Sequence, residues 1–133
     1  MSSGSGSWRS AWLPVACWLL VIFGVSSIPN LKVPDVGLPI ADKFSHLGEY
    51  AVLGALFARA RLSGAGMRRA AWGAALLGLV VGSFDEIYQY RTPGRESSAL
   101  DATADILGAT LGALLWTWIA ARWRARHRRD GES

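Results

Sequence analysis

Four mostly apolar stretches, separated by short polar connections, follow one another along the chain. They cover residues 11–28, about 40–58, 70 to about 87, and 101–121. The hydrocarbon core of a bilayer is about 30 Å thick, so a helix that crosses it needs about 20 predominantly apolar residues. Each stretch comes close to that length. The pattern therefore predicts an all-α membrane protein, built as a compact bundle of four transmembrane helices.

The first two stretches each allow another interpretation. The second has a short uncharged part and is followed at once by Arg59, so it fits the bilayer only inside a tightly packed bundle. The first resembles a signal peptide, because Arg9 precedes it and the small residues Ser26 and Ser27 end it. It is longer than the roughly 7 to 15 residues of a signal peptide's apolar region. We therefore expect one four-helix domain over residues 11–121, between an N-terminal tail (residues 1–10) and a basic C-terminal tail (residues 122–133).

Lysine and arginine are unevenly divided between the two ends of the predicted bundle. Four helices place both chain termini and the connection after the second helix at the same end. Ten of the 14 basic residues lie there: Arg9, Arg59, Arg61, Arg68, Arg69, Arg122, Arg124, Arg126, Arg128 and Arg129. The opposite end has only Lys32, Lys43, Arg91 and Arg95. The positive-inside rule therefore predicts a protein of the cytoplasmic membrane with both termini in the cytoplasm.

Composition excludes several kinds of function. Of the 133 residues, 51% are hydrophobic and 18% are charged, and Cys17 is the only cysteine. A single cysteine supports neither an intramolecular disulfide nor a cysteine-rich metal site. The net charge is +4, but the basic residues mark helix ends and form no basic face beside aromatic residues, as a nucleic-acid-binding protein would show. We therefore expect the lipid bilayer, and no nucleic acid, as a partner of the chain.

The second predicted helix carries ionisable residues along one face. Asp42, His46 and Glu49 are spaced by four and three residues, which places them in one stripe of an α-helix. At 1.5 Å per residue, Glu49 lies roughly 10 Å further along the helix axis than Asp42. An ionisable side chain at that depth in a membrane costs at least about 2.5 kcal/mol, so it should face the bundle or water. The stripe indicates a polar site at the outer end of the bundle, although Asp42 alone could simply cap the helix.

The third and fourth predicted helices combine such a stripe with glycines. One stripe contains Gly78, Gly82, Asp85 and Gln89, and the other contains Asp101, Asp105, Gly108 and Gly112. Glycines four residues apart let two helices approach closely, either within one chain or between the chains of a homo-oligomer. Asp85 and Glu86 end a helix, where the macrodipole disfavours anions. Their position favours a functional or ion-paired role.

The start of the fourth predicted helix holds two acidic residues on one face. Asp101 could form a capping box with Ser98, which would explain it without any function. Asp105 follows one turn later, and two like charges at this spacing repel unless a cation lies between them. Arg91 and Arg95 precede the helix and are candidates for that cation. A guanidinium holds a carboxylate or a phosphate equally well, so Arg95 is either an internal clamp or a ligand contact.

Several short motifs in these stripes occur in the order and spacing of a known family. They are Asp42-Lys43-Phe44-Ser45-His46, Asp85-Glu86-Ile87-Tyr88-Gln89, Pro93-Gly94-Arg95, and Ser98 with Asp101, Gly108 and Gly112. In these features the chain resembles the VanZ-like family of small integral membrane proteins. The resemblance implies a helical membrane protein, and the founding member is linked to resistance to the lipid-tailed glycopeptide teicoplanin. This chain departs from the family pattern at Asp105, where asparagine is usual, which adds a negative charge.

The candidate polar site comprises the polar and charged residues at the outer ends of the predicted helices. They are Asp42, Lys43, His46, Glu49, Asp85, Glu86, Gln89, Arg95, Ser98, Asp101 and Asp105. One imidazole and several carboxylates could hold a divalent metal such as zinc, manganese or magnesium as cofactor. His46, Glu49 and Asp85 are the first candidate ligands, and Glu86 and Asp101 supply further carboxylate oxygens. Their spacing matches no standard zinc motif.

Three functions are compatible with such a site, and the sequence leaves open whether any reaction is catalysed. The first is binding or modification of a lipid-linked or cell-wall molecule, with an effect on sensitivity to teicoplanin-type glycopeptides. The second is metal-dependent hydrolysis or group transfer within the membrane. The third is ion-coupled transport, or a scaffold for another membrane enzyme, because intramembrane carboxylates also form proton relays.

Overall fold

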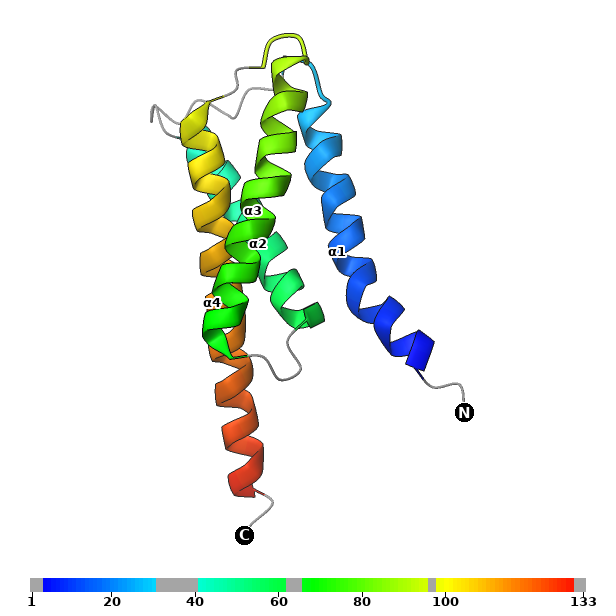
Figure 1. Cartoon of the computed structure of the whole chain (residues 1–133), viewed down its shortest axis with the longest axis vertical. Coiled ribbons are helices and arrows are strands. Elements are labelled where there is room, and N and C mark those ends of the chain that lie inside the picture. The colour runs from blue at the N-terminus through cyan, green and yellow to red at the C-terminus, as the bar shows by residue number, and fades with distance from the viewer. Residues whose placement is uncertain (1–3, 31–40, 62–65, 96–97, 131–133) are drawn as a thin grey trace.

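The structure, a computed structural model of the chain, describes residues 4–30, 41–61, 66–95 and 98–130. It contains four helices: α1 (Gly4–Ser26), α2 (Ala41–Arg61), α3 (Met67–Tyr90) and α4 (Ala99–Asp130). The described residues include no strand, and the predicted all-α fold of four helices is confirmed (Figure 1). Three of the helices, α1, α3 and α4, contain spans that are long and apolar enough to cross a membrane.

Helix boundaries and charge differ in part from the expected pattern. Helix α1 begins inside the predicted N-terminal tail, and α4 continues to Asp130, through most of the predicted basic tail. Helix α2 contains no such span, because Asp42, Lys43, Glu49, Arg59 and Arg61 are distributed over its 21 residues. Its crossing of the membrane stays a prediction, one that depends on how well the other helices cover its charged residues.

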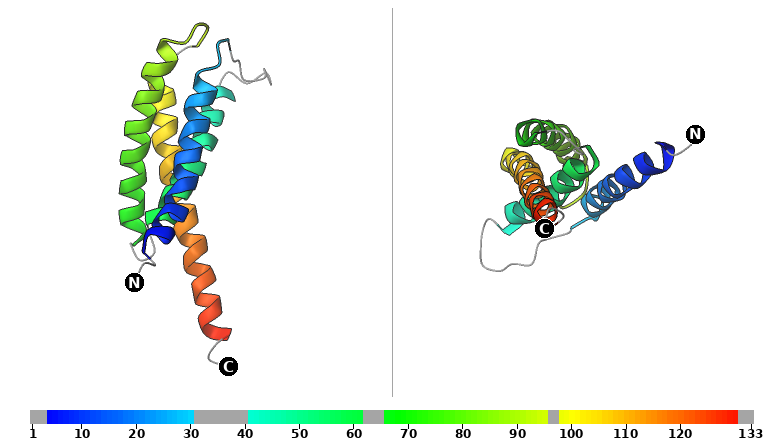
Figure 2. Two further views of the ribbon diagram at one scale, coloured as in Figure 1. Left: turned by 90° about the vertical axis from the view of Figure 1, so that its right-hand side faces the viewer. Right: turned by 90° about the horizontal axis from the view of Figure 1, so that it is seen from below.

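Helix α4 is the element against which the bundle is built. Helices α2 and α3 both pack along it, whereas α1 packs mainly against α2. The N-terminal half of α1 leans away from the other helices, and α4 extends past them at the end where both termini lie (Figures 1 and 2). The up-and-down order of the helices brings the starts of α2 and α4 to the same end as the ends of α1 and α3 (Figure 1).

The crossing of α2 with α4 is close enough for backbone to touch backbone. A Cβ atom at Gly54 of α2 would overlap the carbonyl group of Ala109. On α4, a Cβ atom at Gly108 would overlap the carbonyl oxygen of Leu47, and one at Gly112 would overlap that of Ala51. Hydrogen is thus the only side chain that fits at these three positions. Gly54 was not singled out by the sequence pattern.

The crossing of α3 with α4 also depends on glycine. A Cβ atom at Gly78 would lie 3.0 Å from the carbonyl oxygen of Asp105, and one at Gly82 would lie 2.7 Å from Oδ2 of the same residue. The four glycines of the two predicted seams, Gly78, Gly82, Gly108 and Gly112, therefore all line contacts within one chain. The close approach of α3 to α4 also brings the polar stripes of the two helices together.

Apolar side chains lie both in the centre of the bundle and on its outer surface. Ile22, Tyr50, Leu53 and Ala109 are fully buried. Many larger apolar residues point outward: Leu76, Leu79, Phe84, Ile87, Leu107, Leu111 and Leu115 are all exposed. In water such a surface would be costly, but a bilayer solvates it. Together with the three apolar helices, this surface identifies a membrane protein.

Candidate functional site

Polar side chains from four helices gather at the end of the bundle opposite the chain termini. Helix α1 contributes its last residue, α3 its last turns, and α2 and α4 their first turns. Six polar or charged residues are buried there: Ser26, His46, Asp85, Gln89, Asp101 and Asp105. We call these six, with Asp42, Lys43, Glu49 and Glu86, the polar cluster. Burial of so many ionisable groups is costly unless they are paired or bind something.

The contact between His46 and Asp105 joins α2 to α4 inside the polar cluster. Nδ1 of His46 is 2.9 Å from Oδ1 of Asp105, and the aspartate is fully buried. The two residues come from α2 and α4, at the point where the glycines allow these helices to touch. A carboxylate at this position accepts a hydrogen bond from Nδ1–H. In the neutral imidazole this places the proton on Nδ1 and the lone pair on Nε2. The other carboxylate oxygen, Oδ2, has no hydrogen-bond partner among the described residues.

Lys43 pairs with two aspartates at the mouth of the polar cluster. Its Nζ lies 2.7 Å from Oδ1 of Asp101 and 2.6 Å from Oδ2 of Asp42. The side chain of Asp101 is only 3% exposed, whereas that of Asp42 is 46% exposed. The pair with Asp101 is therefore the energetically important one, because solvent screens the contact with Asp42. The sequence proposes Arg91 and Arg95 as the cation beside Asp101. The ion pair that the structure shows at this carboxylate is with Lys43 from α2.

Gln89 links the end of α3 to the end of α1. Its Nε2 donates hydrogen bonds to Oδ2 of Asp85 at 2.9 Å and to Oγ of Ser26 at 3.2 Å. All three side chains are buried. Sequence reasoning missed Ser26 as a member of the site, since a small polar residue at the end of an apolar helix has many simple explanations. Asp85 keeps Oδ1 without a hydrogen-bond partner in the described part of the chain.

Two connections form the rim of the polar cluster. The backbone N–H of Ser98 donates to Oε2 of Glu86 at 2.7 Å, which attaches the start of α4 to the end of α3. The backbone N–H of Asn30 donates to the carbonyl oxygen of Pro93 at 3.0 Å, which joins the residues after α1 to the turn after α3. Gly94 in that turn has φ +74°, where a Cβ atom would also overlap the side chain of Asn30. The turn thus needs glycine for two reasons.

Two predicted site residues lie at the margin of the polar cluster. Glu49 is half-buried, and its backbone carbonyl accepts a hydrogen bond of 2.9 Å from Nε1 of Trp18. Arg95 is half-buried in the turn before α4. Tyr50, next to Glu49, is fully buried, and its hydroxyl has no hydrogen-bond partner within the described residues. Its aromatic character is the feature of the sequence that draws attention to this tyrosine.

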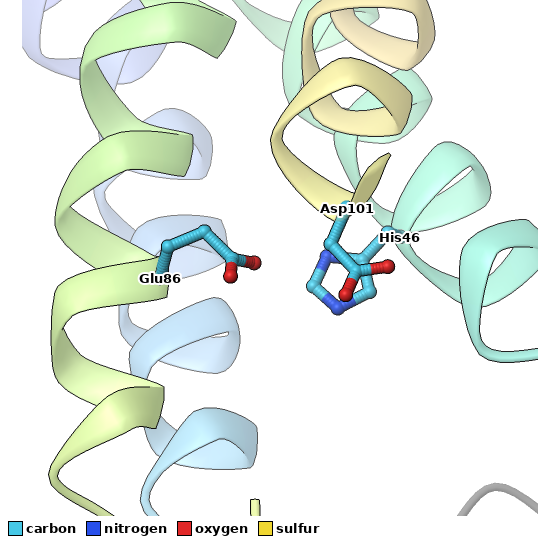
Figure 3. Close-up of side chains that lie close together, drawn as sticks. All are labelled: His46, Glu86 and Asp101. Atoms are coloured by element: carbon cyan, nitrogen blue, oxygen red, sulfur yellow. The ribbon is translucent and has the colours of Figure 1, made fainter. Parts of the chain in front are cut away.

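Three residues of the polar cluster offer ligand atoms to a common point. One atom each from His46, Glu86 and Asp101 lies within 4.8 Å of the others, and the three side chains converge from α2, α3 and α4 (Figure 3). The sequence offers these three residues among its possible ligands, but it names His46, Glu49 and Asp85 as the first candidates. Within the described residues, only His46 of that set belongs to the convergent group. Asp85 accepts a hydrogen bond from Gln89, which lies one turn further along α3.

Comparison with known proteins gives one match. The family model described as VanZ/LLP1 matches residues 19–120, which is more than half of the chain and includes every member of the polar cluster. The comparisons with curated proteins and with solved structures found no match.

Proposed function

This chain belongs to the VanZ/LLP1 family, and on that premise we propose that it binds a lipid-linked molecule of the cell envelope at the polar cluster. Such binding alters the sensitivity of the cell to teicoplanin-type glycopeptides. The observation that carries the proposal is the position of the polar cluster. It is a set of buried ionisable groups at one end of an apolar bundle, where a lipid's polar head meets the membrane interface.

The shape of the protein suits a ligand with an acyl chain. The outer surface of α3 from Leu76 to Ile87 and that of α4 from Leu100 to Ile119 carry exposed apolar side chains, whereas the carboxylates, imidazole and amide of the polar cluster lie at one end of the bundle. A lipid-linked molecule has the same division, because its acyl chain stays in the hydrocarbon and its head stays at the interface. Hydroxyl and amine groups of the head would find acceptors in the carboxylates, and the guanidinium of Arg95, in the turn before α4, would contact a phosphate.

We expect the polar cluster to face away from the cytoplasm. The experiment replaces Cys17 by serine and adds one cysteine, either Thr92→Cys in the turn after α3 or Arg126→Cys near the end of α4. A membrane-impermeant maleimide should label the first variant in intact cells and the second only after lysis, because the basic tail stays inside. The reverse labelling pattern would contradict the orientation and with it the proposed access to an external ligand.

We expect loss of glycopeptide protection when the polar cluster is altered. Cells that express the wild type should tolerate more teicoplanin-type glycopeptide than cells without the protein, and His46→Ala and Arg95→Ala should return susceptibility to the level of the empty strain. Arg122→Ala, at the other end of the molecule, is the matched control and should behave as the wild type. Immunoblots of the membrane fraction verify equal abundance. Unchanged susceptibility in every strain would refute the proposed function.

A further inference from the structure

We propose that His46, Glu86 and Asp101 bind a divalent transition-metal ion of the zinc or manganese type. Nε2 of His46 and one carboxylate oxygen from each acid are the ligand atoms. The inference deepens the proposed function, because it rests on the same polar cluster and specifies how that cluster holds an anionic ligand. The binding of the ion itself can be measured on the purified protein without any lipid.

The geometry of the three side chains is close to that of a coordination site. Ligand atoms bound at about 2.1 Å to a tetrahedral ion lie roughly 3.4 Å apart. The atoms of His46, Glu86 and Asp101 already lie within 4.8 Å of one another. Rotation of the two carboxylate side chains is the movement that would shorten the distances between the ligand atoms. The three residues belong to different helices (Figure 3), so the packing of the bundle sets their arrangement.

Asp105 supports His46 in the manner of a metal site. A histidine that ligates through Nε2 usually gives its Nδ1–H to a carboxylate or a backbone carbonyl, which orients the ring and makes the ligating nitrogen more basic. The 2.9 Å contact between Nδ1 of His46 and Oδ1 of Asp105 has this form. The neutral amide of an asparagine would supply an acceptor without the charge. The negative charge of Asp105, which an asparagine would lack, therefore strengthens His46 as a ligand.

The polar cluster has more acidic than basic groups, even when Arg95 at its margin is counted, and this excess favours the binding of a cation. Its carboxylates are Asp42, Glu49, Asp85, Glu86, Asp101 and Asp105, whereas Lys43 and His46 are its only basic members. Oε1 of Glu86 and Oδ2 of Asp105 are buried without a hydrogen-bond partner in the part of the chain that is described. Lys43 contacts Oδ1 of Asp101, and the carboxylate has a second oxygen that could bind an ion. Two added positive charges would offset this excess of acid.

An ion held by three protein ligands keeps coordination positions for other molecules. One position remains in a tetrahedral site and three in an octahedral site. A phosphate or pyrophosphate of a lipid-linked ligand could fill them. Without an ion, the same phosphate would meet the carboxylates and be repelled. The metal thus explains how an acid-rich site can bind an anionic head group.

The test titrates the chelator-treated, detergent-purified full-length chain with Co²⁺, followed by the visible absorption of the bound ion, and then with Zn²⁺ in competition. We expect one saturable equivalent per chain. His46→Ala should lower affinity at least about 100-fold, and Asp105→Asn by about 10- to 100-fold. Glu49→Gln, which removes a carboxylate of the polar cluster but no atom of the convergent group, should lower affinity far less than His46→Ala does. Size-exclusion chromatography and circular dichroism verify that each variant is folded.

The absence of saturable Co²⁺ binding by the folded wild type would overturn the inference, whatever the variants do. Binding that survives His46→Ala, or that is lost in Glu49→Gln, would overturn the proposed ligand set. The outcome is separable from that of the susceptibility experiment. One Co²⁺ per chain with unchanged susceptibility refutes only the proposed function, whereas susceptibility that follows His46 in a protein that binds no ion refutes only the metal site.

Discussion

Gly54→Ala is expected to destabilise the protein strongly, whereas the same substitution at Gly48 is expected to stabilise it slightly. Both glycines lie on α2, and both substitutions add one methyl group and raise helix propensity by about 1 kcal/mol. They differ in what the methyl meets. At Gly54 it overlaps the carbonyl group of Ala109, whereas at Gly48 it meets no atom within 4 Å. Overpacking in a core costs about 1–3 kcal/mol, and the backbone of a neighbouring helix yields less than a side chain.

The measurement is the thermal unfolding of both variants and the wild type in the same detergent. Because the gain in propensity is common to the two variants, their difference isolates the crossing of α2 with α4. Gly54→Ala should be less stable than Gly48→Ala by at least about 2 kcal/mol. Equal stabilities would mean that the two helices lie further apart than the structure places them. The polar cluster would then lose the close approach that joins His46 to Asp105.

The features that the sequence predicts correctly are those that each helix determines by itself. Apolar length predicts four helices, and spacing by three and four residues predicts the polar faces of α2, α3 and α4. The glycine pairs on α3 and α4 were visible because their members are four residues apart. Gly54 has no glycine partner at that spacing, and its role depends on Ala109 of another helix. Within α2, Gly54 and Ala58 form a pair of small residues at that spacing, which is a weaker signal than two glycines and does not identify the partner helix.

The choice among the candidate metal ligands also depends on contacts between helices. Spacing places Asp85 on the glycine stripe of α3 and Glu86 beside it, so the sequence favours Asp85 as a ligand. Which of two neighbouring carboxylates meets His46 depends on the rotation of α3 about its own axis relative to α2 and α4. In the structure Asp85 accepts a hydrogen bond from Gln89. Glu86 meets His46 and Asp101 instead. A helical repeat determines which residues share a face, but contacts between helices determine which residue of that face lies opposite a partner.

Lys43→Met is expected to lower the stability of the metal-free protein, because it leaves Asp101 as a buried charge without its cation. Removal of one partner from a buried ion pair costs about 3–5 kcal/mol. The side chain of Lys43 is 26% exposed, so we expect the lower end of that range, about 3 kcal/mol. The double variant Lys43→Met/Asp101→Leu should recover part of the loss, since no unpaired carboxylate remains. Arg59→Met, an exposed cation on the same helix, should change stability by less than about 0.5 kcal/mol.

Unfolding of Lys43→Met with and without Zn²⁺ then connects stability to the metal site. An ion at His46, Glu86 and Asp101 places positive charge beside the carboxylate that Lys43 no longer neutralises. It should therefore stabilise Lys43→Met more than it stabilises the wild type, in which ion and ammonium repel each other. At a free Zn²⁺ concentration of 100 times the Kd of the wild type, binding of the ion should raise the free energy of unfolding of the wild type by about 2.7 kcal/mol. The double variant lacks a ligand atom and should respond much less. Equal responses of all three proteins to Zn²⁺ would mean that the ion binds away from Asp101, since only an ion beside that carboxylate can replace the charge of Lys43.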